Sequence, residues 1–225
     1  MNSPLVFWAT HKLGGAISPA NPAYGSSELA YQLKDSGSTA LITSSSLLPT
    51  ALEALKDVPA ISAQNVFLVD GDKHDKYVTV EQLIQLGRNS GRKVEQLRLK
   101  KGEGMKRLAF ICYSSGTTGL PKGVMISHYN IIANVLQISS HTKEFDDRKR
   151  EITLALLPLY HIYGMASWLL LIVRISIRPP WRTLSWKHMR HCSRFRFSYF
   201  SLLYSEISNE KTLFSPPYRH QTRKR

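Results

Sequence analysis

The sequence predicts an α/β fold with a largely parallel sheet, because short apolar strands alternate with amphipathic helices along most of its 225 residues. Three apolar runs support the strand prediction, at residues 39–43, 65–69 and 108–113. Between them, leucines and alanines recur at the three- and four-residue spacing of a helix face. This alternation is typical of strands that lie parallel and are connected by helices.

The first elements follow in order. Ser27 is a candidate N-cap for a helix that ends at Gly37, and the run 39–43 then forms a buried strand. A helix over 47–56 precedes the strand over 65–69.

The second half of the pattern begins with Thr79 and Gln82, which have capping-box spacing and predict that another helix begins there. A polar, basic connector over about 87–107 follows. The remaining predicted elements are a strand buried on both faces over 108–113, a helix around 131–136 and a strand over 152–157.

Charge and periodicity both change near residue 172. Residues 1–172 contain 18 Lys and Arg against 14 Asp and Glu, whereas residues 173–225 contain 12 against 2. Most of the net charge of +14 therefore lies in the last quarter, where the hydrophobic periodicity also ends. We predict a partial domain over 1–172 and an irregular basic tail over 173–225, either disordered or read from a shifted frame.

Composition disfavours several other protein classes. Two cysteines, Cys112 and Cys192, are too few for a disulfide scaffold or a cysteine-rich zinc site; they suit an intracellular protein, and we expect no metal site in the chain. The uncharged segment around 154–173 is interrupted by a proline, a histidine and a glycine, so we expect no membrane span. The C-terminus, 223–225, is not an S-K-L-type address, which leaves cytoplasm and peroxisome both open.

The strongest local signal is YSSGTTGLPKGV over 113–124, directly after the predicted strand 108–113. Its hydroxyls and closely approaching backbone N–H groups suit a polyphosphate, and Lys122 adds a positive charge. It is neither a Walker A loop nor a dinucleotide fingerprint. A lone glycine-rich loop is usually a surface turn, but here nine motif residues follow one another in the expected order directly after a strand, which favours a phosphate site.

This loop resembles the signature loop of the adenylate-forming superfamily, which includes acyl-CoA synthetases, 4-coumarate–CoA ligases and beetle luciferases. Two more blocks agree: GGAISPANPAY over 14–24 resembles the upstream region of the coumarate-ligase and luciferase branch, and LPLYHIYGM over 157–165 resembles the block that lines the acyl pocket. The blocks stand in the family's order within about residues 4–171. The resemblance implies a partial N-terminal domain, with a layered, parallel-rich sheet and helices.

The resemblance also implies an ATP-dependent, AMP-forming acyl-CoA ligase. In that reaction a small-molecule carboxylic acid attacks the α-phosphorus of MgATP, and CoA then displaces AMP. ATP, Mg²⁺ and CoA are thus the implied cofactors and partners. The matching positions for the ATP phosphates are Ser114, Ser115, Gly116, Thr117, Thr118, Gly119 and Lys122.

Lys122 and His161 match catalytic positions, and His161, Tyr163 and Ser167 match the block that contacts the acyl group and the adenylate. Taken alone, these last three residues are more often a core histidine, a core tyrosine and a helix serine. The resemblance favours substrate contact for His161 and Tyr163, and both interpretations stay open for Ser167.

The family's pattern is not found beyond about Leu171: we find no Y-G-x-T-E adenine motif, no ribose-binding aspartate, no hinge and no C-terminal lid. We therefore predict a truncated, catalytically incomplete chain. The alternative is a non-catalytic nucleotide- or partner-binding remnant whose basic tail, with aromatic residues over 195–200, binds single-stranded nucleic acid by stacking and charge. No RNP motif or zinc-finger spacing supports this, so we do not expect nucleic-acid binding.

Overall fold

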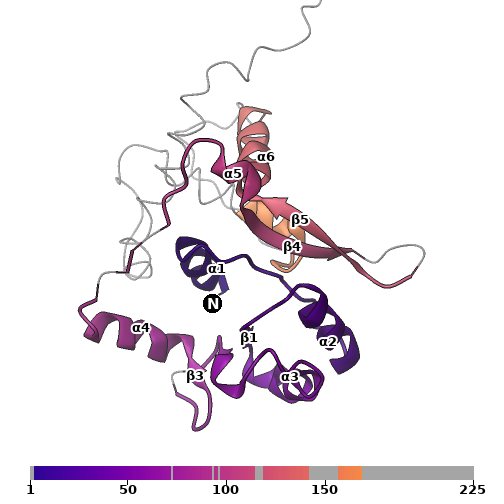
Figure 1. Ribbon diagram of the computed structural model, residues 1–225, viewed down its shortest axis with the longest axis vertical. Helices are drawn as coiled ribbons and strands as arrows, with labels where there is room; N and C mark the ends of the chain where they lie inside the picture. The colour runs from indigo at the N-terminus through magenta and orange to yellow at the C-terminus, as the bar shows by residue number, and fades with distance from the viewer. Residues whose placement is uncertain are drawn as a thin grey trace, which may run out of the picture. The chain divides into compact units, whose positions relative to one another are not determined.

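The computed structural model describes residues 3–71, 73–92, 94–95, 97–114, 119–141 and 157–168, all of which belong to one compact unit. The predicted α/β class is confirmed, because helices alternate with strands along these residues (Figure 1). The strands β1 (Leu41–Thr43), β2 (Val66–Leu68) and β3 (Val78–Thr79) form a parallel sheet in that order. Helix α3 (Leu48–Leu55) connects β1 to β2, as a parallel pair requires.

Helix α2 (Ser26–Asp35) shows how local sequence sets a helix boundary. The Glu28 carboxylate accepts a hydrogen bond from the Gly25 N–H at 2.8 Å, so the N-cap is Gly25. The predicted N-cap, Ser27, is wrong, because Glu28 accepts the hydrogen bond from position N3 and the N-cap is therefore three residues before Glu28. The predicted end is confirmed: Gly37 has a φ of +62°, and two N–H groups beyond the helix donate back to its last turn.

Helix α4 (Val80–Asn89) begins with the predicted capping box. The Gln82 N–H donates to the Thr79 hydroxyl at 3.2 Å, and the Thr79 N–H donates to the Gln82 side-chain oxygen at 2.9 Å. The predicted connector over 87–107 is partly wrong, because α4 continues to Asn89 and the short helix α5 (Glu103–Lys106) lies near its other end.

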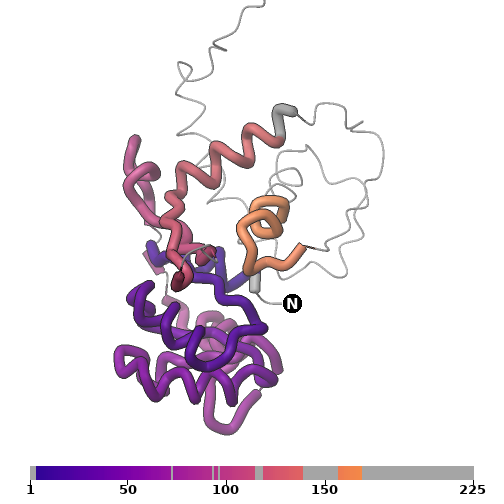
Figure 2. Tube along the Cα trace, turned by 90° about the vertical axis from the view of Figure 1, so that its right-hand side faces the viewer, coloured from indigo at the N-terminus to yellow at the C-terminus, as the bar shows by residue number. Residues whose placement is uncertain are grey.

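The first cluster of buried side chains lies among α2, α3 and the parallel sheet. Helices α2 and α3 pack side by side (Figures 1 and 2). Central strand β2 buries Val66 and Leu68, but β1 is at the sheet edge and Ile42 is exposed, so the predicted burial of 39–43 is wrong. The members are Ala30, Leu33, Leu48, Ala54, Val58, Ile61, Val66, Leu68 and Tyr77.

The strands β4 (Leu108–Ser114) and β5 (Lys122–Ser127) form an antiparallel hairpin. β5 is absent from the sequence prediction, and it begins inside the phosphate-loop motif. The second buried cluster lies here and consists of Ala109, Phe110 and Met165, with half-buried side chains around it. Within β4, only Ala109 and Phe110 are fully buried, so the predicted burial on both faces holds for the middle of the strand alone.

Helix α1 (Ser3–Lys12) is also absent from the sequence prediction, and it packs against this second cluster. The rings of Phe7 and Phe110 meet edge to face at 5.9 Å. After α1, Ile17 forms an isolated parallel bridge with Phe110, and its N–H donates to the Ala109 carbonyl at 3.0 Å. The segment that begins the GGAISPANPAY block is therefore attached to β4.

Helix α6 (His128–His141) follows β5 directly and confirms the helix predicted around 131–136 (Figure 2). The predicted strand over 152–157 lies outside the described residues except for Leu157, which is exposed in a bend. Residues 173–225 also lie outside them. No helix in the described part of the chain is long and apolar enough to cross a membrane.

The start of α6 leads to a prediction about acid sensitivity. His128 and His11 are both buried, with ring centroids 5.0 Å apart. Burial, together with the neighbouring His11 and Arg107, lowers the pKa of His128 from 6.5 to about 4. Burial also lowers the pKa of His11, although its side chain hydrogen-bonds the Ala109 carbonyl at 3.0 Å.

Between pH 6.5 and about 4, His128 is protonated in the unfolded chain but neutral in the folded one, so the unfolded chain binds more protons. The contribution of neutral His128 to stability is therefore complete above pH 6.5 and is lost as the pH falls to about 4. We expect the free energy of unfolding to fall by on the order of 2 kcal/mol between pH 7 and pH 4.5, measured by urea denaturation. His128→Gln should flatten this dependence, because glutamine does not titrate. An equal slope in the wild type and the variant would contradict the prediction.

Candidate functional site

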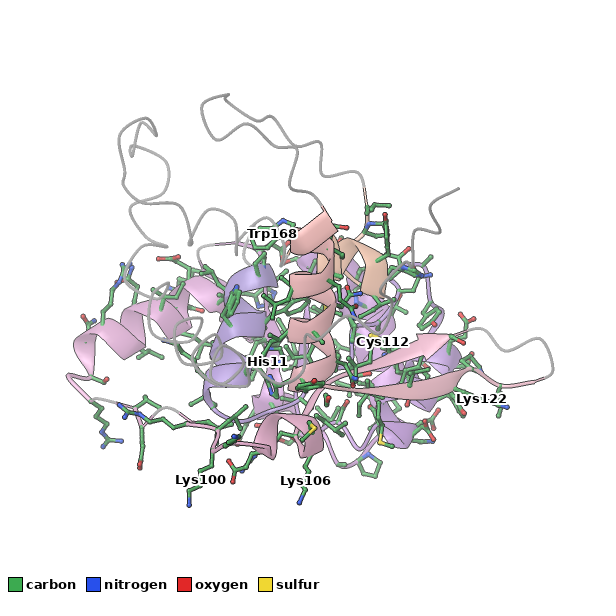
Figure 3. All side chains as sticks on the ribbon, turned by 90° about the horizontal axis from the view of Figure 1, so that it is seen from above. His11, Lys100, Lys106, Cys112, Lys122 and Trp168 are labelled. Atoms are coloured by element: carbon green, nitrogen blue, oxygen red, sulfur yellow. The ribbon has the colours of Figure 1, made fainter. Side chains whose placement is uncertain are left out.

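The motif predicted to hold phosphate lies at the end of the β4–β5 hairpin. The strand register pairs Ser114 with Lys122, so the first hydroxyl of the motif and its only lysine start from facing positions. Residues directly opposite each other in an antiparallel pair project from the same face. Both are exposed, and Figure 3 shows Lys122 toward the loop end of the hairpin, apart from His11 and Trp168.

The loop between these strands is described in part. Gly119 has a φ of +146°, which only glycine adopts without strain, so the structure explains this glycine of the motif. The predicted members Ser115, Gly116, Thr117 and Thr118 lie outside the described residues. The described phosphate candidates are therefore Ser114, Gly119 and Lys122.

The second group of predicted site residues is His161, Tyr163 and Ser167. Tyr163 and Ser167 belong to the helical segment 162–168, and His161 directly precedes it. The Nδ1 atom of His161 accepts a hydrogen bond from the Tyr163 N–H at 3.3 Å, so this imidazole caps the segment. Both side chains are exposed, with 63% of Tyr163 accessible, so they are not core residues of the described structure. The Ser167 hydroxyl donates to the Tyr163 carbonyl at 2.8 Å, as expected of a helix serine.

Gly164 determines how closely this helical segment packs, a role that is absent from the sequence prediction. A Cβ atom added there would lie 2.3 Å from the Pro158 carbonyl oxygen and 3.0 Å from the Leu157 carbonyl oxygen. Both contacts are with backbone atoms, which cannot move aside as a flexible side chain can. The glycine of LPLYHIYGM therefore lets the turn at Leu157 and Pro158 pack closely against the helical segment, whose Met165 is buried in the second cluster.

An apolar pocket lies between α1, β4 and the segment 157–168. Its lining residues are Pro4, Phe7, Trp8, His11, Phe110, Leu159, Met165 and Trp168. None of the predicted site residues in the described part of the chain lines it. In the same part of the chain, no hydrogen bond, ion pair or ring contact joins the Lys122 hairpin to the His161 segment.

Two further groups bear on the chemistry. Burial raises the pKa of the Cys112 thiol to about 11, so this free cysteine stays protonated near neutral pH and is a poor nucleophile. Among the described residues, no three His, Cys, Asp or Glu side chains lie close enough together to hold a metal ion.

Two side chains of α2 that contact the hairpin are also absent from the sequence prediction. The Tyr31 hydroxyl donates to the Pro121 carbonyl at 3.0 Å, and the Tyr113 hydroxyl donates to the Asp35 carboxylate at 2.5 Å. The four-residue spacing of Tyr31 and Asp35, which places them on one helix face, was an available signal. Nothing in the sequence indicates what that face contacts.

The profile of the AMP-binding enzymes matches residues 2–205, and the chain belongs to this family. The family predicted from the three motifs is thereby confirmed. The match extends past residue 172, so the domain boundary there stays a prediction.

Curated relatives are acyl-CoA ligases. The chain is 37% identical over 160 residues to the acyl-CoA ligase AFT1-1 of Alternaria alternata, an alignment that covers 70% of this chain and 27% of that protein. It is 35% identical over 167 residues to the peroxisomal OPC-8:0-CoA ligase 1 of Arabidopsis thaliana, covering 73% of this chain and 28% of that protein. The chain therefore spans just over a quarter of the length of these relatives.

Solved structures agree on the fold. A long-chain-fatty-acid-CoA ligase from Archaeoglobus fulgidus matches with a TM-score of 0.55 and 26% identity, over 76% of this chain and 31% of that one. ATP-bound MatB from Rhodopseudomonas palustris matches with a TM-score of 0.57 and 24% identity, over 75% of this chain and 30% of that one. The predicted fold class, a partial N-terminal domain of an adenylate-forming enzyme, is confirmed.

Proposed function

We propose that this chain is part of an ATP-dependent, AMP-forming acyl-CoA ligase and supplies the site that holds the phosphates of ATP. The observation that carries the proposal is the exposed pairing of Ser114 with Lys122 at the loop end of the hairpin, in a member of the AMP-binding enzyme family. The names of the relatives support the acyl-CoA ligase activity, with a small-molecule carboxylic acid and CoA as co-substrates.

The residues of the hairpin suit a polyphosphate. Lys122 provides an ammonium group that donates up to three hydrogen bonds, and Ser114 adds a hydroxyl donor from the facing strand. These groups would neutralise charge on the pyrophosphate that leaves when a carboxylate attacks the α-phosphorus. Ser115, Gly116, Thr117, Thr118 and Gly119 would supply the other donors and the tight turn. Mg²⁺ would arrive bound to the phosphate oxygens and offset part of their charge.

The exposed side chains of His161 and Tyr163 are the proposed contacts of the acyl group and adenylate, with His161 in a catalytic role. Both project from a segment whose position is set by Gly164 and by the burial of Met165. Ser167 is the weakest of the three substrate candidates, because its hydroxyl already donates to the Tyr163 carbonyl.

We expect these 225 residues by themselves to bind MgATP or pyrophosphate without completing acyl-CoA synthesis. The chain spans 27–28% of its relatives, and catalysis depends on holding the carboxylate and the α-phosphate in line as well as on binding pyrophosphate. The tests are calorimetric binding of MgATP and pyrophosphate, and carboxylate-dependent pyrophosphate release with hydroxamate trapping, over a panel of aliphatic and aromatic acids. A full-length acyl-CoA ligase serves as the positive control.

The possible results separate the two parts of the proposal. Binding without turnover would support both. Robust turnover that disappears in Lys122→Ala would support the ligase function and contradict the catalytic incompleteness. Failure of the folded chain to bind either ligand would contradict the phosphate site itself.

A further inference from the structure

Two side chains on one face of α2 contact the hairpin next to its two paired phosphate candidates. Tyr31 bonds the carbonyl of Pro121, the residue before Lys122. Asp35 bonds the hydroxyl of Tyr113, the residue before Ser114. The Tyr31 contact joins residues 90 positions apart in the sequence and reaches the residue directly before β5. The Asp35 contact joins residues 78 positions apart and reaches the last residue but one of β4.

Packing around Tyr113 explains another glycine of the motif. Gly123 is the cross-strand partner of Tyr113, and a Cβ atom there would lie 3.0 Å from the ring carbon Cζ and 3.1 Å from the hydroxyl oxygen. The Tyr113 ring therefore lies across β5 where Gly123 leaves space. The rings of Tyr31 and Tyr113 also approach edge to face, with centroids 6.4 Å apart and planes at 82°.

The charge state of Tyr113 is consistent with a lasting donor. Burial is the largest cause that raises the pKa of this phenol well above its ordinary value, and the hydrogen bond and negative charge of Asp35 raise it further. The hydroxyl is therefore protonated throughout the neutral range and donates to the carboxylate.

Helix α2 is held in place by buried side chains of its own. Ala30 and Leu33 are buried in the first cluster, and the buried side chain of Gln32 donates to the Ser18 hydroxyl at 2.8 Å. The hairpin has less support of its own, because the four residues 122–125 at the start of β5 are exposed and a two-stranded hairpin is only marginally stable alone.

We propose that Tyr31 and Asp35, acting with Tyr113, are positioning residues that hold the two strands at the loop end and so set Lys122 opposite Ser114 for phosphate binding. We call these three residues the α2 brace. The inference rests on the proposed function, because that function assigns Lys122 to phosphate. It adds residues outside the motif to the determinants of phosphate affinity.

The test measures pyrophosphate affinity of the 225-residue chain by calorimetry. Tyr31→Phe, Tyr113→Phe and Asp35→Ala should each weaken binding by about 3- to 10-fold, the effect of one lost hydrogen bond. Tyr113→Phe and Asp35→Ala remove the same bond, so the double variant should bind about as well as either single variant. Asp35→Asn keeps an acceptor oxygen and should recover most of the affinity.

The matched control is Glu28→Ala, which weakens the start of the same helix but removes no contact with the hairpin. It should lower the free energy of unfolding by about 0.5–1 kcal/mol and leave pyrophosphate affinity unchanged. A general loss of α2 stability would instead reduce affinity in this variant too, and that result would contradict a specific positioning role.

A measurement without ligand separates the brace from the phosphate site. Amide hydrogen exchange of β5 should be faster in Tyr31→Phe and Tyr113→Phe than in the wild type, while exchange in β2 stays the same. Unchanged exchange in β5, or variants that bind pyrophosphate as well as the wild type, would overturn the brace. A third result is also possible: the wild type does not bind pyrophosphate, yet β5 exchanges faster in the variants. That result would support the brace as a structural contact, but it would overturn both its role in phosphate binding and the proposed function.

Discussion

Replacing Lys122 by alanine is expected to weaken pyrophosphate binding by about 10- to 150-fold, which corresponds to roughly 1.5–3 kcal/mol. The variant loses the only lysine of the hairpin motif, at a position that faces a serine hydroxyl and is open to solvent. Because the side chain is exposed, its removal leaves no cavity and should leave the free energy of unfolding within about 0.5 kcal/mol of the wild type.

Two further variants identify the origin of the effect. Lys100→Ala removes an exposed lysine before α5 (Figure 3) and should leave pyrophosphate affinity unchanged. Lys122→Arg keeps the charge but changes the donor geometry, and it should bind between the wild type and Lys122→Ala. Affinity of the wild type should also fall as salt is raised, because the contact is exposed. Equal binding by wild type and Lys122→Ala would contradict the assignment of Lys122 to phosphate.

Gly164→Ala should lower the free energy of unfolding by about 2–3 kcal/mol, measured by urea denaturation. The added methyl group would lie 2.3 Å from the carbonyl oxygen of Pro158, so the turn before the helical segment must open. Opening it would pull Met165 out of the second cluster, where it is buried with Phe110. The change should therefore also disturb the segment that carries His161.

Gly87→Ala provides the matched control, since the same methyl group added in α4 meets nothing within 4 Å. Alanine is favoured over glycine inside a helix, so this variant should be more stable than the wild type by up to about 1 kcal/mol. If both variants had the same stability, the close approach of Gly164 to Pro158 would not be what requires glycine there.

Features decided by neighbouring residues could be predicted from the sequence by itself. The capping box of Thr79 and Gln82 and the termination of α2 by Gly37 both formed as predicted, because hydrogen bonds within a single turn determine them. The family could also be predicted from the sequence, since three motifs in a fixed order carry more information than any one of them. The same motifs pointed to Lys122 before its position was known.

Contacts between distant segments could not be predicted in this way. The motif over 113–124 was predicted to be a loop throughout, but Lys122 begins β5, because pairing with Ser114 and its neighbours in β4 compensates for the poor strand propensity of Gly123. The exposure of Ile42 depends on the face of the sheet from which it projects: its neighbours in register, Phe67 and Val78, are not fully buried either.

The candidate site shows the same division. Its residue types were set by the motif, so the sequence alone determined a cationic, hydroxyl-rich loop, for which phosphate binding is our proposal. The support for that loop from Tyr31 and Asp35 was decided only by the tertiary structure, which joins α2 to a hairpin 78 and 90 residues away. Hydrogen bonds at that separation depend on where packing places the two elements, and local periodicity contains no information about that placement.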